Sequence, residues 1–184
     1  DGCFCGREDA KTNANHDQHD ERISSTRIRE CLLQGDLATA KHLLGRDYTI
    51  MGEVMHGDKI GRTLDFPTAN IALNRIKPAL HGIFGVSVVA TDGSDLSSLG
   101  QLGQTGVQGL TTGSLFGACN VGTRPAVDGK EWRLEINFPQ FAGDLYGQEL
   151  TVTFLHFLHG ERDYKGLEAL KTGITQDVVD LLAW

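Results

Sequence analysis

The sequence has little positive charge, few aromatic residues and no long apolar run. Its 184 residues carry 17 Lys and Arg against 24 Asp and Glu, a formal net charge of -7 at pH 7. Proteins that coat nucleic acid present a basic face, so this acidic balance argues against that class. No apolar run approaches the ~20 residues that cross a bilayer, and no signal-peptide pattern opens the chain. We therefore expect a cytoplasmic protein with neither a nucleic-acid nor a membrane partner.

Cysteine is also scarce, which excludes a fold held together mainly by disulfides. The chain has four cysteines, and in the cytoplasm their thiols are expected to stay reduced. Cys3 and Cys5 precede two histidines, but their spacing is tighter than in usual zinc sites, so a flexible tail is the favoured interpretation. Cys31 and Cys119 lie in apolar patterns and are expected to be small core residues.

The first 44 residues divide into a tail and a helical segment. Residues 1–22 are polar and cannot bury enough surface to become ordered, so we expect a flexible tail. Residues 23–44 predict two short helices. The first spans 25–34, and the second is capped by Asp36 and ended by Gly45.

Residues 45–184 predict a mainly β domain. Short strands without long helices between them favour an antiparallel sheet or a closed barrel. The predicted strands are 48–56, 84–91, 115–121, 131–138 and 149–157. Residues 92–114, rich in Gly, Ser, Thr and Gln, indicate an extended or partly disordered hairpin insertion. The chain ends in a predicted helix with an apolar stripe that is expected to pack on the barrel: Leu167, Leu170, Ile174, Val178 and Leu181.

Residues 57–70 give the most specific indication of a binding site. Glycines and cations in this loop can bring backbone N–H groups and positive charge to phosphate oxygens: Gly57, Lys59, Gly61 and Arg62. After Pro67, Thr68 and Asn70 offer a hydroxyl and an amide oxygen, ligands that magnesium accepts. From these residues alone, a solvated hairpin loop is an equally good interpretation.

Glu135 lies on the polar face of a predicted strand. In residues 131–138, Arg133, Glu135 and Asn137 alternate with apolar side chains, so Glu135 points away from the apolar stripe. Alternation alone favours a solvated carboxylate, with a general base as the alternative.

Five motifs occur in an order that resembles a known family. They are Gly-x-x-x-Gly-Arg-x-Leu-x-Phe-Pro-Thr-Ala-Asn at 57–70, Gly-Ile-Phe-Gly-Val at 82–86, Asn-Val-Gly-Thr-Arg-Pro at 120–125, Leu-Glu-Ile-Asn-Phe at 134–138 and Gly-Asp-Leu-Tyr-Gly at 143–147. This order resembles the riboflavin kinase module of bacterial bifunctional riboflavin kinase/FMN adenylyltransferases (FAD synthetases). The resemblance implies a six-stranded antiparallel Greek-key β-barrel with flanking helices. It also implies that the riboflavin ribityl 5′-hydroxyl is phosphorylated by ATP, giving FMN and ADP.

The resemblance implies roles for individual residues. Glu135 falls where the family keeps the carboxylate that takes the hydroxyl proton. Thr68 and Asn70 match its magnesium and phosphate ligands. The implied nucleotide-binding residues are Gly57, Lys59, Gly61, Arg62, Pro67, Thr68, Asn70 and Asn120. The implied flavin-side residues are Arg124, His159 and Glu161. Asn120 and Arg124 are equally well explained as turn residues, and Phe84 and Tyr146 are expected to be core aromatics.

Two positions depart from the family pattern. Asp65 stands where glycine is usual, and its carboxylate would repel a triphosphate unless it faces away. His159 stands where the C-terminal segment usually carries arginine, which puts the flavin-side contacts in doubt. Both departures favour the alternative of a non-catalytic flavin- or nucleotide-binding barrel. A structural module that docks on a missing partner domain is a further alternative.

A second resemblance concerns residues 23–29. Their sequence, Ile-Ser-Ser-Thr-Arg-Ile-Arg, resembles the Ile-Ser-Ser-Thr-x-x-Arg motif that closes nucleotidyltransferase modules. In the bifunctional enzymes that module precedes the kinase. We therefore expect residues 23–44 to be its C-terminal remnant and its missing body to be a candidate partner. The full-length parent is expected to make FAD, and this chain is expected to lack FMN adenylyltransferase activity.

Overall fold

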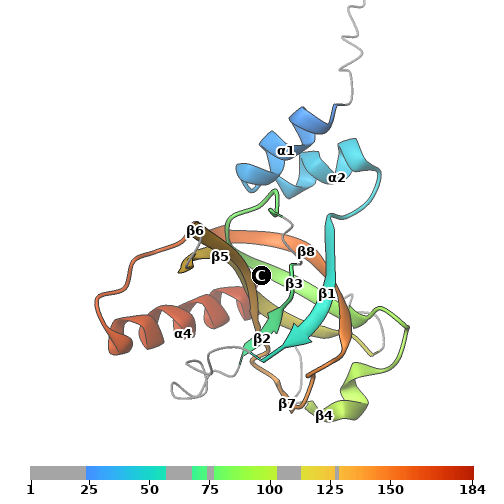
Figure 1. Cartoon of the computed structure of the whole chain (residues 1–184), viewed down its shortest axis with the longest axis vertical. Helices are drawn as coiled ribbons and strands as arrows, with labels where there is room; N and C mark the ends of the chain where they lie inside the picture. The colour runs from blue at the N-terminus through green and yellow to red at the C-terminus, as the bar shows by residue number, and fades with distance from the viewer. Residues whose placement is uncertain (1–23, 57–67, 74–76, 103–112, 127–128) are drawn as a thin grey trace, which may run out of the picture.

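The computed structural model describes residues 24–56, 68–73, 77–102, 113–126 and 129–184, without the side chains of Leu102, 124–126 and 129–130. Within these ranges the chain forms two N-terminal helices, a closed barrel and a C-terminal helix that lies beside the barrel (Figure 1). The predicted tail lies outside the described residues.

Six antiparallel strands close the barrel. They are β1 (Thr49–Met55), β2 (Thr68–Ile71), β3 (Gly82–Ala90), β5 (Leu115–Ala126), β6 (Gly129–Asn137) and β8 (Glu149–His159). Their order around the barrel is β1-β2-β6-β5-β3-β8. Strands β3, β5 and β6 form a meander, and β8 returns to lie beside β3, which is a Greek-key arrangement. The predicted six-stranded Greek-key barrel is confirmed.

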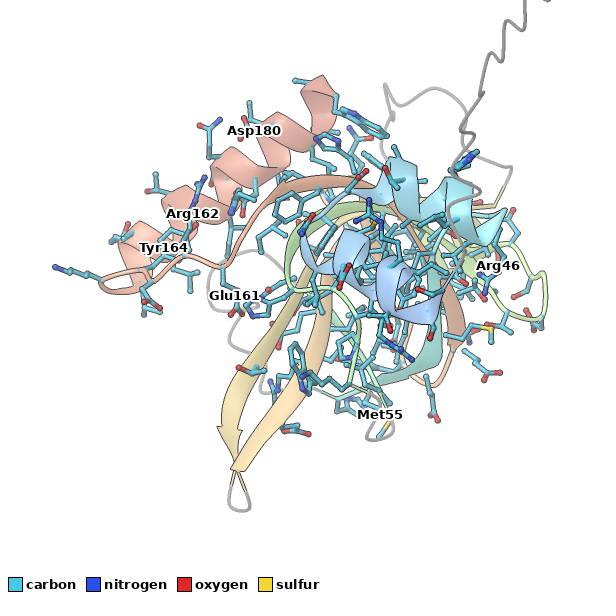
Figure 2. The ribbon with its side chains drawn as sticks, turned by 90° about the horizontal axis from the view of Figure 1, so that it is seen from above. Arg46, Met55, Glu161, Arg162, Tyr164 and Asp180 are labelled. Carbon is cyan, nitrogen blue, oxygen red and sulfur yellow. The ribbon has the colours of Figure 1, made fainter. Side chains whose placement is uncertain are left out.

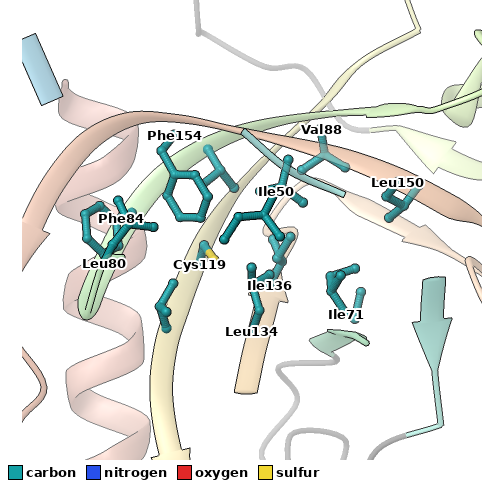
Figure 3. Packing of buried hydrophobic residues seen from close by; sticks show 14 of the residues in the cluster. Ile50, Ile71, Leu80, Phe84, Val88, Cys119, Leu134, Ile136, Leu150 and Phe154 are labelled. Carbon is teal, nitrogen blue, oxygen red and sulfur yellow. The ribbon is translucent and has the colours of Figure 1, made fainter. Parts of the chain in front are cut away.

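The interior of the barrel is filled by the side chains that face inward from each strand. Phe84 and Phe154 meet edge to face with ring centroids 5.4 Å apart, and Leu134 and Ile136 of β6 are almost fully buried (Figure 3). Cys119 is fully buried beside them. The alternation that predicted an inner and an outer face for β6 is therefore confirmed, and Glu135 lies on the outer face.

Two capped helices lie at one end of the barrel (Figure 1). In α1 (Ser25–Leu33), the Ser24 hydroxyl accepts a hydrogen bond from the Arg27 N–H at 3.2 Å. In α2 (Leu37–Leu44), Asp36 accepts from the Thr39 N–H at 3.0 Å, and Gly45 ends the helix at φ 72°. Their buried residues join the core of the barrel: Cys31, Leu32, Ala40 and Leu43. The boundary proposed near residue 44 stays a prediction.

The predicted insertion is more ordered at its start than expected. Asp95 caps a short 3₁₀ helix, η1 (Leu96–Leu99), in which Leu96 is fully buried. Strand β4 (Gly100–Leu102) follows and pairs with β7 (Phe141–Gly143). Residues 103–112 lie outside the described residues. A buried leucine and a strand partner more than thirty residues away supply the order that local composition did not reveal.

The interpretation of Asn120 and Arg124 as turn residues is wrong. The motif at 120–125 is not a turn, because β5 continues to Ala126 and stays paired with β6. The apolar stripe expected in α4 (Leu167–Ala183) is buried at Leu181 and half-buried at Leu170, Ile174 and Val178, whereas its first residue, Leu167, is 59% exposed. The part of α4 near Leu181 packs on the barrel, where Gly85 lacks a Cβ that would crowd the leucine.

No helix among the described residues has the length and apolar character to cross a membrane.

Candidate active site on the outer face of the barrel

Glu135 lies between two asparagines that come from neighbouring strands. In the ladder of β2 and β6, Asn70 is paired with Glu135, and in the ladder of β5 and β6, Asn120 is paired with the same glutamate. Paired residues project on the same side of a sheet with their Cβ atoms about 5 Å apart. The barrel therefore brings together three of the predicted site residues, which span 65 positions of the sequence from Asn70 to Glu135.

Thr68 lies on the same outer face of β2 as Asn70. The burial of β2 alternates, with Ala69 and Ile71 buried and Thr68 and Asn70 half-buried. Thr68 also lines a small pocket of about 80 Å³ together with Asp144 and Tyr146, which belong to the predicted 143–147 motif. Thr68 and Asn70 thus form a polar edge that leads from this pocket to Glu135.

Tyr146 packs against the hydrophobic core, as expected, but is only partly buried. Its ring is half-exposed and lies 3.9 Å from the ring of His56, centroid to centroid. The Tyr146 N–H donates to the Asp144 carboxylate at 3.0 Å, which fixes the turn. Phe84, in contrast, is fully buried, so that prediction is confirmed.

Glu135 forms an ion pair with Arg133 of the same strand. The Arg133 Nη1 atom lies 3.2 Å from Glu135 Oε1, and both side chains are partly exposed. Arg133 is paired across the ladder with Gly122 of β5. A Cβ added at Gly122 would overlap the Glu161 carboxylate, so this carboxylate lies directly on the β5 backbone at Gly122.

Glu161 reaches the site from the connection between β8 and α4. Figure 2 labels it there, with Arg162 and Tyr164 following toward α4. Its Oε2 atom lies 2.9 Å from His81 Nε2, just before β3. Among the flavin-side predictions, Glu161 is thus the one that the structure places beside Asn120 and Gly122.

The other two flavin-side predictions lie differently. The His159 ring is held between the Gly160 carbonyl oxygen, 2.6 Å from Nδ1, and the Asp177 carboxylate, 2.7 Å from Nε2. It therefore ties the end of β8 to α4. Arg124 lies in β5, paired with Glu131, and its side chain is outside the described residues. The flavin-side roles of all three residues stay predictions.

Five nucleotide-binding predictions lie outside the described residues: Gly57, Lys59, Gly61, Arg62 and Pro67. The segment that contains them joins β1 to β2. Its ends are the half-buried Thr68 and the exposed His56, which lie near the same pocket region. The connectivity therefore attaches the predicted phosphate loop to the edge of the site.

Asn120 presents a polar atom that lacks a partner. Its Oδ1 atom is buried from solvent and makes no hydrogen bond within the described part of the chain. A buried carbonyl oxygen left unpaired costs about 1–3 kcal/mol. A donor from a bound ligand, or a cation, would satisfy this oxygen. Asn120 thus adds an unsatisfied oxygen atom next to Glu135.

Beneath this face lies Cys119. Burial raises the pKa of its thiol well above the usual value, and the nearby Glu135 carboxylate raises it further. The thiol therefore stays protonated and apolar, and serves packing rather than nucleophilic chemistry.

The donor set suits a magnesium ion that is shared with phosphates. Thr68 and Asn70 supply neutral oxygen atoms, and Glu135 supplies a carboxylate next to them. No group of three or more His, Cys, Asp or Glu side chains in the described ranges could hold a metal by itself. Magnesium is usually bound by few protein ligands together with substrate phosphates, so these residues fit it.

Sequence reasoning missed Arg133 and His81 as members of the site. Arg133 shares the polar face with Glu135 at a spacing of two residues, and this alternation was a usable signal. His81 gave none, because its contact with Glu161 spans 80 positions. Gly122 was recognised only as part of a motif, not as the space for a carboxylate.

The sequence comparisons with known proteins point to one family. The family model described as Flavokinase: Riboflavin kinase matches residues 44–184. The chain is 38% identical over 159 residues to a bifunctional riboflavin kinase/FMN adenylyltransferase from Haemophilus influenzae, covering 86% of this chain and 45% of the relative. A protein of the same description from Pseudomonas fluorescens is 42% identical over 159 residues, covering 85% of this chain and 44% of the relative.

A solved structure shares the fold. It is described as a macrolide-efflux protein from Streptococcus pneumoniae, with a TM-score of 0.69 and 29% identity, covering 88% of this chain and 47% of that chain. The chain spans less than half the length of the curated relatives that it matches. Because the family model covers most of the sequence, including every strand of the barrel, the chain belongs to the riboflavin kinase family.

Proposed function

We propose that this chain phosphorylates the ribityl 5′-hydroxyl of riboflavin with ATP and releases FMN and ADP. The observation that carries this proposal is the row of Asn70, Glu135 and Asn120 across three strands, in a chain of the riboflavin kinase family. A carboxylate flanked by neutral polar groups on a rigid sheet is suited to accept a proton from a hydroxyl.

The proposed reaction is an in-line displacement at the γ-phosphorus. The riboflavin hydroxyl oxygen forms a bond to phosphorus as the bond to the ADP oxygen breaks, and Glu135 takes the hydroxyl proton. Asn70 and Asn120, on either side of Glu135, bind the substrates and fix their position. The protein forms no covalent bond to the substrates in this step. Positioning and charge stabilisation therefore supply most of the rate acceleration.

Thr68 and Asn70 would hold magnesium together with the nucleotide phosphates. Bound magnesium neutralises charge on the phosphate oxygens. The proposed nucleotide contacts of Gly57, Lys59, Gly61, Arg62 and Pro67 complete the nucleotide side. On the flavin side we propose Arg124, His159 and Glu161, with Glu161 supported by its position beside Asn120.

The test is to incubate the purified chain with riboflavin, ATP and magnesium and to separate the flavins by chromatography with fluorescence detection. FMN that appears in proportion to enzyme and depends on ATP supports the proposal. Absence of FMN, with ADP release also absent, would overturn it. Binding of riboflavin or ATP without product would instead identify a non-catalytic flavin- or nucleotide-binding barrel.

The same assay addresses adenylylation. The relatives are described as bifunctional, but the region that this chain shares with them is less than half of their length. We propose that this chain forms FMN without FAD, and that the rest of the module is a partner in the full-length parent. FAD in the product mixture would contradict this.

We also propose a cytoplasmic location. ATP as the phosphoryl donor and two buried free thiols, Cys31 and Cys119, support a reducing compartment that contains nucleotides. Fractionation of the host cell, followed by detection of the chain with an antibody, tests this.

A further inference from the structure

Arg133 and Glu135 form a partly desolvated ion pair on the outer face of β6. Residues two apart on a strand share a face, and the guanidinium Nη1 lies 3.2 Å from Oε1 of the carboxylate. The arginine side chain is 21% exposed and the glutamate side chain 30% exposed. At this burial the pair is less screened by water and salt than a pair on an open surface.

A second carboxylate lies against the strand that neighbours Arg133. Glu161 lies on the backbone of Gly122, and Gly122 is the residue paired with Arg133 across the ladder. Its Oε2 atom, however, is engaged by His81 at 2.9 Å. On the neighbouring strands, the residues paired with Glu135 are the uncharged Asn70 and Asn120. Arg133 is thus a cation held in direct contact with Glu135.

We propose that Arg133 is a positioning residue that fixes the carboxylate of Glu135 for proton transfer. This rests on the function proposed above. Glutamate has three rotatable side-chain bonds, so each contact that holds its carboxylate reduces the number of orientations it samples. By holding Oε1, the planar guanidinium restricts the carboxylate to the row between Asn70 and Asn120. Arg133 acts through Glu135 and does not touch the reacting atoms.

The geometry makes this role distinguishable from simple stabilisation. A partly exposed ion pair contributes little to folding, about 0–1 kcal/mol. A misplaced catalytic group, in contrast, lowers turnover strongly even when the substrates still bind. A positioning role therefore lowers kcat with little change in KM or in unfolding midpoint.

The experiment compares Arg133→Gln and Arg133→Lys with the wild-type chain in steady-state kinetics. We expect Arg133→Gln to lower kcat about tenfold while KM for riboflavin and for ATP stays within about twofold. Arg133→Lys keeps the charge and is expected to recover part of this loss. The matched control is Lys41→Gln, which removes the exposed ion pair with Asp47 on α2 and is expected to leave kcat unchanged.

A double-mutant cycle tests whether Arg133 acts through Glu135. In a Glu135→Gln background, Arg133→Gln is expected to lower the residual kcat no further. An equal loss in both backgrounds would overturn the proposal. So would a raised KM for ATP with unchanged kcat, since Arg133 would then be a nucleotide ligand. If the wild type forms FMN and Arg133→Gln has an unchanged kcat, the positioning role alone is overturned. If the wild type forms no FMN, the proposed function itself is overturned.

Discussion

Glu135 lies directly opposite Asn120 in the ladder between β5 and β6, and the buried Oδ1 of that asparagine has no partner among the described residues. On the other side of Glu135, Asn70 occupies the equivalent position on β2. The two asparagines and the glutamate form a polar row on the outside of an otherwise conventional hydrophobic barrel. This row is the physical basis of the predictions that follow.

The first prediction concerns magnesium. If Thr68 and Asn70 hold it with the nucleotide, then Asn70→Ala should raise the magnesium concentration needed for half-maximal rate by about tenfold or more. The measurement is FMN formation at fixed ATP across a magnesium series. Gln101→Ala, an exposed position on β4, is the control and should leave the curve in place. An unchanged curve for Asn70→Ala would remove Asn70 as a ligand.

The second prediction concerns the space above Gly122. An added Cβ overlaps the Glu161 carboxylate, so Gly122→Ala should displace Glu161 and break its contact with His81. Glu161 is a flexible and partly exposed side chain, so the loss of stability should stay near or below about 1 kcal/mol. Riboflavin affinity, measured by fluorescence quenching, should fall in Gly122→Ala and in Glu161→Gln alike. Gly160→Ala, where a Cβ meets open space, is the control.

The third prediction concerns the attachment of α4. His159 and Asp177 form a contact of 2.7 Å between β8 and α4, and Asp177 is 6% exposed. Replacing Asp177 with Ala leaves a buried ring nitrogen unpaired, so we expect a loss of about 1–3 kcal/mol in urea unfolding. Asp180→Ala, on the exposed face of the same helix, should change the midpoint far less. Equal effects of the two variants would show that the contact does not anchor the helix.

The fourth prediction concerns alkaline pH. Burial, reinforced by Glu135, raises the pKa of the Cys119 thiol well above 9.0, the value it regains on unfolding. Above about pH 9 the unfolded chain therefore loses a proton that the folded chain keeps, and stability falls as the pH rises. Unfolding midpoints at pH 8 and pH 10 should differ more in the wild type than in Cys119→Ala. An identical difference in both proteins would contradict this assignment.

How far the sequence predicts this structure depends on the range of the interactions involved. Strands such as β6 could be predicted because Leu134 and Ile136 alternate with polar residues, and the helix caps at Ser24 and Asp36 are local. Strand β2 has only four residues, so alternation was too short to identify it. The order of η1 and β4 depends on distant partners, which local composition does not report.

The same limit applies to the candidate site. Glu135, Thr68, Asn70 and Asn120 were identified by motif, and the barrel register then showed Asn70, Glu135 and Asn120 to be neighbours. The contact between His81 and Glu161 joins two polar residues with no shared pattern, so nothing in the sequence pointed to it. Likewise, the burial of Asp177 on α4 could not be anticipated, because its partner His159 lies outside the helix.

The most direct test of the account measures FMN formation by Glu135→Gln at saturating ATP, riboflavin and magnesium. This variant keeps the shape of the side chain but cannot act as a base. We expect kcat to fall by about a hundredfold or more, while the circular dichroism spectrum shows normal folding. The control is Glu168→Gln, at an exposed position of α4, which should keep the wild-type rate. A wild-type rate in Glu135→Gln would contradict the account and remove Glu135 from the mechanism.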